Sequence, residues 1–144
     1  MTRDIRIDAP GAGEWVMQRV EGYFTPGLDH SFTRYRDEQI MGGIVLCQYL
    51  GNSMTAHMAG EDKYWCSREL LWMVFHYGFE QVGCTKMLGP VRSDNYRALE
   101  MDMRGGWELE AVIRDVYEPG VHMMVLSMTK DSCPWLKYQP RRVV

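Results

Sequence analysis

The amino-acid sequence predicts an α/β domain, in which a central sheet carries helices on its faces, and three observations support this prediction. Residues 53–60 (SMTAHMAG) alternate apolar and polar side chains, as a half-buried strand does. Residues 41–51 form a continuous apolar run, typical of a strand that is buried on both faces. Residues 67–82 place apolar side chains at helical spacing. Strands and helices that interleave in this way pack as layers around one core.

The first half of the chain shows these patterns between clear breaks. Pro10 ends the first alternating segment, and Thr25-Pro26-Gly27 ends the first helical one. The predicted elements are a strand at 4–10, a helix at 13–24, and strands at 30–38, 41–51 and 53–60.

The second half begins with the helix at 67–82, for which Ser67 is a suitable N-cap and Gly83 a suitable stop. Pro119-Gly120 is predicted to form the turn of a hairpin. The remaining predicted elements are a strand at 85–92, a helix at 95–105, and hairpin strands at 107–118 and 121–129. We therefore expect one domain over residues 1–133 and a loose tail over 134–144.

Composition excludes several classes of function. The 144 residues suffice for one domain with a core, and the net charge of −3 shows no basic footprint of a nucleic-acid binder. No apolar run approaches the roughly 18 residues of a membrane span, and the N-terminus lacks the apolar core of a signal peptide. The four cysteines are scattered, which indicates reduced thiols without a metal site and a cytoplasmic protein.

The segment 93–107 (SDNYRALEMDMRGGW) holds the most informative helix. A helical wheel places Asn95 and Asp102 on one side, while Glu100 and Arg104 form an i,i+4 pair on the solvated side. A carboxyl on the inner side must be paired, hydrogen-bonded or exposed to a cavity, because burial of a bare charge is costly. The simpler reading is that Asn95 only caps the helix and that Asp102 reaches a surface edge.

The same helix carries a family resemblance. Asn95 and Ala98, followed after seven residues by Gly106 and Trp107, resemble the last helix of the GCN5-related N-acetyltransferases, the GNAT superfamily. The likeness covers residues 55–130 and extends to the first fifty residues by element order alone. It implies a mostly antiparallel sheet that splays between its fourth and fifth strands, near residues 54–59 and 85–92, with helices on both faces. Acetyl-CoA would lie in the gap, beside Asn95.

The family's pyrophosphate-binding loop is altered in this chain. Asp62 stands at the position of a cation, and Trp65 stands at that of the central glycine. The helix N-terminus still attracts anions, and Lys63 lies nearby as a source of charge. The resemblance implies cofactor contacts from Met58, Tyr64, Trp65, Cys66, Ser67, Arg68, Asn95 and Arg97.

The resemblance also implies the catalytic candidates. Asp102 stands where many members of the family have a tyrosine that protonates the leaving thiolate, whereas in others the solvent does so. An aspartate has an ordinary pKa of about 3.9, so burial would have to raise that pKa by several units. His57 and Glu61 are the candidate bases, each with an ordinary solvated side chain as the alternative. A lowered pKa of Cys66 at the helix N-terminus would be incidental.

Two functions remain open at this stage. The first is an enzyme that transfers an acetyl group from acetyl-CoA to an amine of an unknown small molecule or protein by direct attack. The second is a binding module of the same fold that grips another protein, through exposed aromatic side chains at Tyr64, Trp65 and 135–138. Similar compact chains occur in phage genomes, where a host protein would be the partner. Both functions are compatible with a homodimer.

Overall fold

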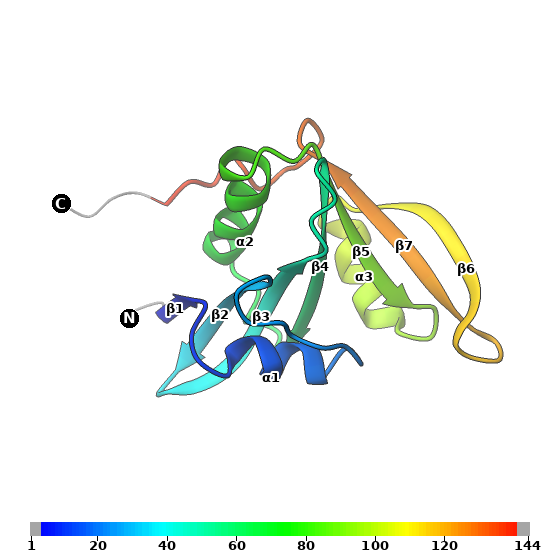
Figure 1. The fold of residues 1–144 in the computed structure, drawn as a ribbon, viewed down its shortest axis with the longest axis horizontal. Coiled ribbons are helices and arrows are strands. Elements are labelled where there is room, and N and C mark those ends of the chain that lie inside the picture. The colour runs from blue at the N-terminus through cyan, green and yellow to red at the C-terminus, as the bar shows by residue number, and fades with distance from the viewer. Residues whose placement is uncertain (1–3, 141–144) are drawn as a thin grey trace.

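The computed structural model describes residues 4–140, and within this range seven strands form a single sheet (Figure 1). The strands are β1 (Asp4–Ile7), β2 (His30–Arg36), β3 (Gln39–Cys47), β4 (Ser53–Gly60), β5 (Lys86–Arg92), β6 (Glu108–Glu118) and β7 (Val121–Thr129). The helices are α1 (Ala12–Gln18), α2 (Arg68–Phe75) and α3 (Tyr96–Arg104), with a π-helical segment η1 (His76–Gln81) that continues α2. The predicted order of strands and helices is confirmed.

The sheet is antiparallel except where β4 and β5 pair in parallel. Its strand order is β1-β2-β3-β4-β5-β7-β6. The parallel pairing joins only Ser53–Thr55 of β4 to Lys86–Leu88 of β5, after which the two strands part, as Figure 1 shows. The mostly antiparallel sheet with a splay between its fourth and fifth strands is therefore confirmed.

Helices cover both faces of the sheet, as predicted. Along β3 the side chains alternate, so that Ile44 and Leu46 belong to the larger hydrophobic cluster and Val45 to the smaller one. The larger cluster also contains Leu70 and Phe75 of α2. The smaller cluster contains Val16 of α1, so α1 lies on the opposite face from α2.

The predicted helix at 67–82 is an α-helix that becomes a π-helix at His76. Ser67 caps its start, because its side-chain oxygen accepts a hydrogen bond from the Leu70 N–H at 3.1 Å. The rings of Phe75 and Phe79, four residues apart along this segment, stack in the core with 5.8 Å between their centroids. Gly83, with a φ of 90°, ends the segment as expected.

The segment after β7 differs from the predicted loose tail. The indole N–H of Trp135 donates a hydrogen bond to the Gly105 carbonyl at 2.8 Å, which holds the segment against the end of α3. Trp135 and Leu136 also pack against the larger cluster. The C-terminal carbonyls of a helix have no partner within the helix, so they offer acceptors for such a donor.

None of the helices in the described part of the chain is long and apolar enough to cross a membrane.

Candidate active site

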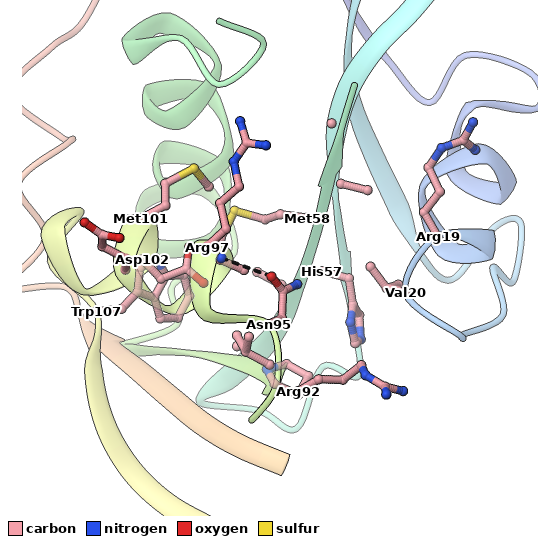
Figure 2. A pocket seen from close by; sticks show the side chains of 18 of the residues that line it. Arg19, Val20, His57, Met58, Arg92, Asn95, Arg97, Met101, Asp102 and Trp107 are labelled. Carbon is pink, nitrogen blue, oxygen red and sulfur yellow. Dashed lines mark hydrogen bonds between the residues drawn. The ribbon is translucent and has the colours of Figure 1, made fainter. Parts of the chain in front are cut away.

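The parting of β4 and β5 opens a cleft of about 920 Å³ (Figure 2). Its lining comes mainly from β4, the loop that follows β4, β5, α3 and the segment that follows α1, with single residues from β6 and β7. The cleft reaches both faces of the sheet, because His57 of β4 pairs with Val45 and so faces α1, whereas Met58 packs against the larger cluster on the α2 face. Groups from opposite sides of the sheet can therefore meet inside it.

One edge of β4 is free along this cleft. Residues 56–60 pair with β3 on one side, while the ladder to β5 stops at Thr55. Backbone N–H and C=O groups without a ladder partner are strong hydrogen-bonding sites. An extended ligand that contains amide groups would fit such an edge in the manner of an added strand.

Asn95 begins α3 at the wall of this cleft. Its side-chain oxygen accepts a hydrogen bond from the Ala98 N–H at 3.2 Å, the contact drawn in Figure 2. This confirms the capping reading. Because the oxygen serves the cap, the amide NH₂ group is the part of the side chain that remains for a ligand.

Asp102 is the buried residue of α3, with an exposed fraction of 7%. Burial raises the pKa of its carboxyl to about 7, so both protonation states are populated near neutral pH. Asp102 and Asn95 both line the cleft, as the helical wheel indicates. In Figure 2 the carboxyl of Asp102 points away from Asn95.

The outer faces of α3 agree only in part with the wheel. Arg104 and Glu100 form the expected i,i+4 ion pair at 2.7 Å. The apolar side chains of Met101 and Met103 are 43% and 51% exposed. Asp102 is the buried residue of α3 and Leu99 packs partly buried against the larger cluster, while other residues of the helix line the cleft.

His57 lies on the α1 side of the cleft and has a lowered pKa. The main cause is burial, which disfavours the imidazolium, and the charge of Asp29 opposes it. A neutral imidazole at pH 7 can accept a proton. Glu61 also lines the cleft, but its carboxylate accepts hydrogen bonds from the Arg19 guanidinium at 3.0 and 3.1 Å. His57 is therefore the better placed of the two candidate bases.

Hydrogen bonds and packing within the protein fix the loop between β4 and α2. The carboxylate of Asp62 accepts a hydrogen bond from the Tyr64 N–H at 2.8 Å, and Arg34 donates to the Tyr64 carbonyl. The ring of Trp65 lies against Gly42 of β3 and Gly60 of β4, where any Cβ atom would collide with it. With 6% of its surface exposed, Trp65 belongs to the core.

This placement corrects two expectations about the loop. Trp65 is not an exposed aromatic side chain, whereas Tyr64 is 65% exposed. The pKa of Cys66 is raised to about 12 instead of lowered, because the thiol is buried and lies near the charge of Asp102. An inert thiol agrees with the reading of Cys66 as incidental.

The sequence-predicted site residues fall into two groups. Those that line the cleft are His57, Met58, Glu61, Trp65, Asn95, Arg97 and Asp102. Tyr64, Cys66, Ser67 and Arg68 stand outside that lining. Arg68 instead lies over the ring of Tyr138, 4.8 Å from its centroid.

Two arginines of the cleft were not expected from the sequence. Arg19 joins α1 to Glu61, and Arg92 joins the end of β5 to Glu21 at 3.1 Å and to Asp94 at 3.0 Å. Arg92 ends the predicted strand at 85–92 beside the splay, a position that could have singled it out. Arg19 and its partner Glu61 are 42 residues apart in sequence, and no pattern connects them.

Within residues 4–140 no group of three His, Cys, Asp or Glu side chains is placed to hold a metal ion.

Comparison with known proteins identifies solved structures that have a similar fold. No protein-family model and no curated protein matches the sequence. Among solved structures, the chain is similar to spermidine N-acetyltransferase from Vibrio cholerae in complex with CoA and spermine, with a TM-score of 0.67, 12% identity, and coverage of 90% of this chain and 96% of that one.

It is also similar to a protein from Desulfovibrio desulfuricans that is assigned to the GNAT family of acetyltransferases. That match has a TM-score of 0.69, 17% identity, and coverage of 89% of this chain and 99% of that one. The splayed sheet, the helices on both faces and these matches agree, and the chain therefore has the fold of the GCN5-related N-acetyltransferases.

Proposed function

We propose that the protein is an acetyl-CoA-dependent N-acetyltransferase, in which an amine attacks the acetyl thioester directly. The observation that carries this proposal is the cleft through the sheet, which is lined from both faces where β4 and β5 part. The thioester arm would enter from the side of α3, and the amine from the side of α1. The two reactants would then be held in fixed positions at the splay, so that a bimolecular reaction becomes effectively unimolecular.

The arm of the donor contains amide groups, which suit the free edge of β4. Met58 would contact the arm, and Trp107 would close the inner wall. The amide NH₂ of Asn95 would donate to a carbonyl of the arm. The guanidinium of Arg97, which extends along the cleft in Figure 2, would bind a phosphate.

The proposed reaction needs one proton acceptor and one proton donor. The amine nitrogen forms a bond to the acetyl carbon, the carbon–sulfur bond breaks, and the amine loses a proton to His57 directly or through a water. The sulfur leaves as a thiolate and takes up a proton. Asp102 would supply it, because a carboxyl with a pKa of about 7 is partly protonated at neutral pH.

The wall on the α1 side bears on the class of acceptor. Its carboxylates Glu21 and Glu61 are already paired with Arg92 and Arg19. A polyamine, the acceptor of the Vibrio cholerae enzyme, would have to displace these arginines. We therefore propose an acceptor with a single amine, on a small molecule or a protein side chain.

The alternative function is a binding module that uses the fold without turnover. The internal hydrogen bond of Asp62 favours this alternative, since it occupies part of the loop that binds pyrophosphate in the family. The burial of Trp65 weakens it, because the expected aromatic surface loses one of its two tryptophans.

The test combines binding with turnover. Acetyl-CoA should raise the melting temperature and, with a panel of monoamines, amino acids, lysine peptides and spermidine, should be consumed with release of free thiol. Asp102→Asn should then lower the turnover number with little change in the Michaelis constant for acetyl-CoA, because an amide is a poor proton donor. Equal turnover in this variant would leave the solvent as the acid. If acetyl-CoA neither binds nor releases free thiol, the result supports the binding module instead.

A further inference from the structure

We propose that the cleft recognises its donor as a thioester of pantetheine or 4′-phosphopantetheine and makes little use of the nucleotide half of CoA. This inference rests on the proposed function. It names the part of the donor that the site can hold, and it follows from the contacts of the loop over residues 61–67 and from the charges of the cleft.

Three of the seven backbone N–H groups of the loop over residues 61–67 already donate to acceptors of the protein. Those of Glu61 and Ser67 donate to the carbonyls of Met41 and Trp65, at 2.8 and 3.1 Å. That of Tyr64 donates to the carboxylate of Asp62 at 2.8 Å. A phosphate at Tyr64 would have to displace an anionic acceptor that is part of the same loop. The carboxylate thus stands where a ligand phosphate would otherwise be bound.

The loop is also fixed in this shape. Arg34 holds the carbonyl of Tyr64, and Arg36 lies 3.5 Å from the second oxygen of Asp62. Trp65 is buried against Gly42 and Gly60 and cannot leave without exposing its ring. The close approach of phosphate to backbone that glycines permit is therefore closed at this position.

The charges of the cleft fit one phosphate better than several. Within the described residues, the basic and acidic side chains of the lining are equal in number, five of each. Arg19, Arg92 and Arg104 are paired with carboxylates. Within residues 4–140 no ion pair engages the other two basic residues of the lining, Arg97 and Lys63. The ammonium of Lys63 lies over the ring of Tyr64, 5.0 Å from its centroid, so Arg97 is the guanidinium left for a phosphate.

Phosphopantetheine carries one phosphate, which one guanidinium can bind through parallel hydrogen bonds. CoA adds a second phosphate and a 3′-phosphate, and the other arginines of the lining, Arg19, Arg92 and Arg104, are already paired with carboxylates. The cleft therefore offers attraction for the arm and its first phosphate, and little for the rest of the molecule.

Calorimetry on the full chain tests this with CoA, 4′-phosphopantetheine and 3′,5′-ADP as separate titrants. We expect the dissociation constants of CoA and phosphopantetheine to agree within about threefold, because the shared arm supplies the binding energy, and 3′,5′-ADP to leave CoA binding unchanged. CoA binding a hundredfold tighter than phosphopantetheine, with competition by 3′,5′-ADP, would overturn the inference and leave the proposed function standing. No heat with any titrant would remove both.

A variant isolates the role of Asp62. Asp62→Ala frees the Tyr64 N–H, so CoA should bind about tenfold tighter while phosphopantetheine binds as before. Glu14→Ala removes an exposed carboxylate of α1 outside the cleft and should change neither affinity. If Asp62→Ala leaves the affinity for CoA at the wild-type value, the internal carboxylate does not exclude the nucleotide. The ranking of ligands on the wild-type protein decides the matter even if the variant folds poorly.

Discussion

The indole ring of Trp65 lies across Gly42 and Gly60, which are cross-strand partners on β3 and β4. A Cβ atom at Gly42 would lie 2.4 Å from the ring, and one at Gly60 would lie 2.0 Å from it. No side chain can be added at either position while the ring stays in place. The large residue in the loop and the two glycines of the sheet therefore form one packed unit.

This contact predicts the cost of Gly60→Ala. The methyl group should expel the ring and lower the free energy of unfolding by about 1–3 kcal/mol, the range of overpacked cores. Chemical denaturation measures the loss. In a Trp65→Ala background the same change should cost far less, because the colliding ring is absent. Equal costs in both backgrounds would show that the two residues do not interact.

Asp102 predicts how stability depends on pH. Its folded-state pKa of about 7 lies above its unfolded value, so it binds a proton more tightly in the folded protein. Its contribution is complete below the unfolded pKa and is lost as the pH rises to about 7. Asp102→Asn should therefore be more stable than the wild type at pH 8, by about 2 kcal/mol, and lose that advantage at pH 4.

Thermal melts at the two pH values check this prediction. Asp94 serves as the control, because its hydrogen bonds with Arg92 lower its pKa, so its stabilising effect is present at high pH and lost in acid. Asp94→Asn should show no gain at pH 8. A pH-independent difference between wild type and Asp102→Asn would mean that Asp102 stays ionised in the folded protein.

His57 predicts the acid limb of the activity profile. As the base, it must be neutral, and burial lowers its pKa below the ordinary value of 6.5. The rate of acetyl transfer at low acceptor concentration should therefore fall only below about pH 6.5 as the pH is lowered. His57→Gln should remove this limb and lower the rate by about a hundredfold. Glu61→Gln is the matched comparison, and a larger loss there would reverse the assignment.

The elements were predictable because their signals are local. The strand over residues 53–60 and the capped helix start at Ser67 each follow from signals within a few residues, and both elements are confirmed. Thr55, on the polar side of the alternation, is buried as well, because helices cover both faces of the sheet. The switch from α2 to η1 was not predicted, because the apolar pattern of residues 67–82 fits an α-helix throughout and does not mark the start of a π-helical turn. The docked Trp135 was missed because its partner is a backbone carbonyl 30 residues away, which no pattern marks.

The candidate site was predictable where the resemblance fixed a position. Asn95 and Asp102 line the cleft as their spacing on one helix indicates. The prediction that Trp65 is exposed was wrong. A large residue at the position of the family's glycine suggests an exposed side chain, and the sequence does not show that Gly42 and Gly60 leave room for its ring. Those glycines come from two strands whose register only the folded sheet reveals.

Asn95 combines two roles that substitution can separate. Its oxygen caps α3 through the Ala98 N–H, and its NH₂ group would serve the donor. Asn95→Ala should lose both, which lowers the free energy of unfolding by about 1 kcal/mol and weakens acetyl-CoA binding. Asn95→Asp keeps an oxygen for the cap, and its negative charge is favourable at a helix N-terminus. It should therefore keep wild-type stability and still bind acetyl-CoA more weakly, because it has no hydrogen to donate.

Denaturation and calorimetry on the two variants check this pair of outcomes. If Asn95→Asp binds acetyl-CoA as tightly as the wild type, the cap is the whole function of Asn95.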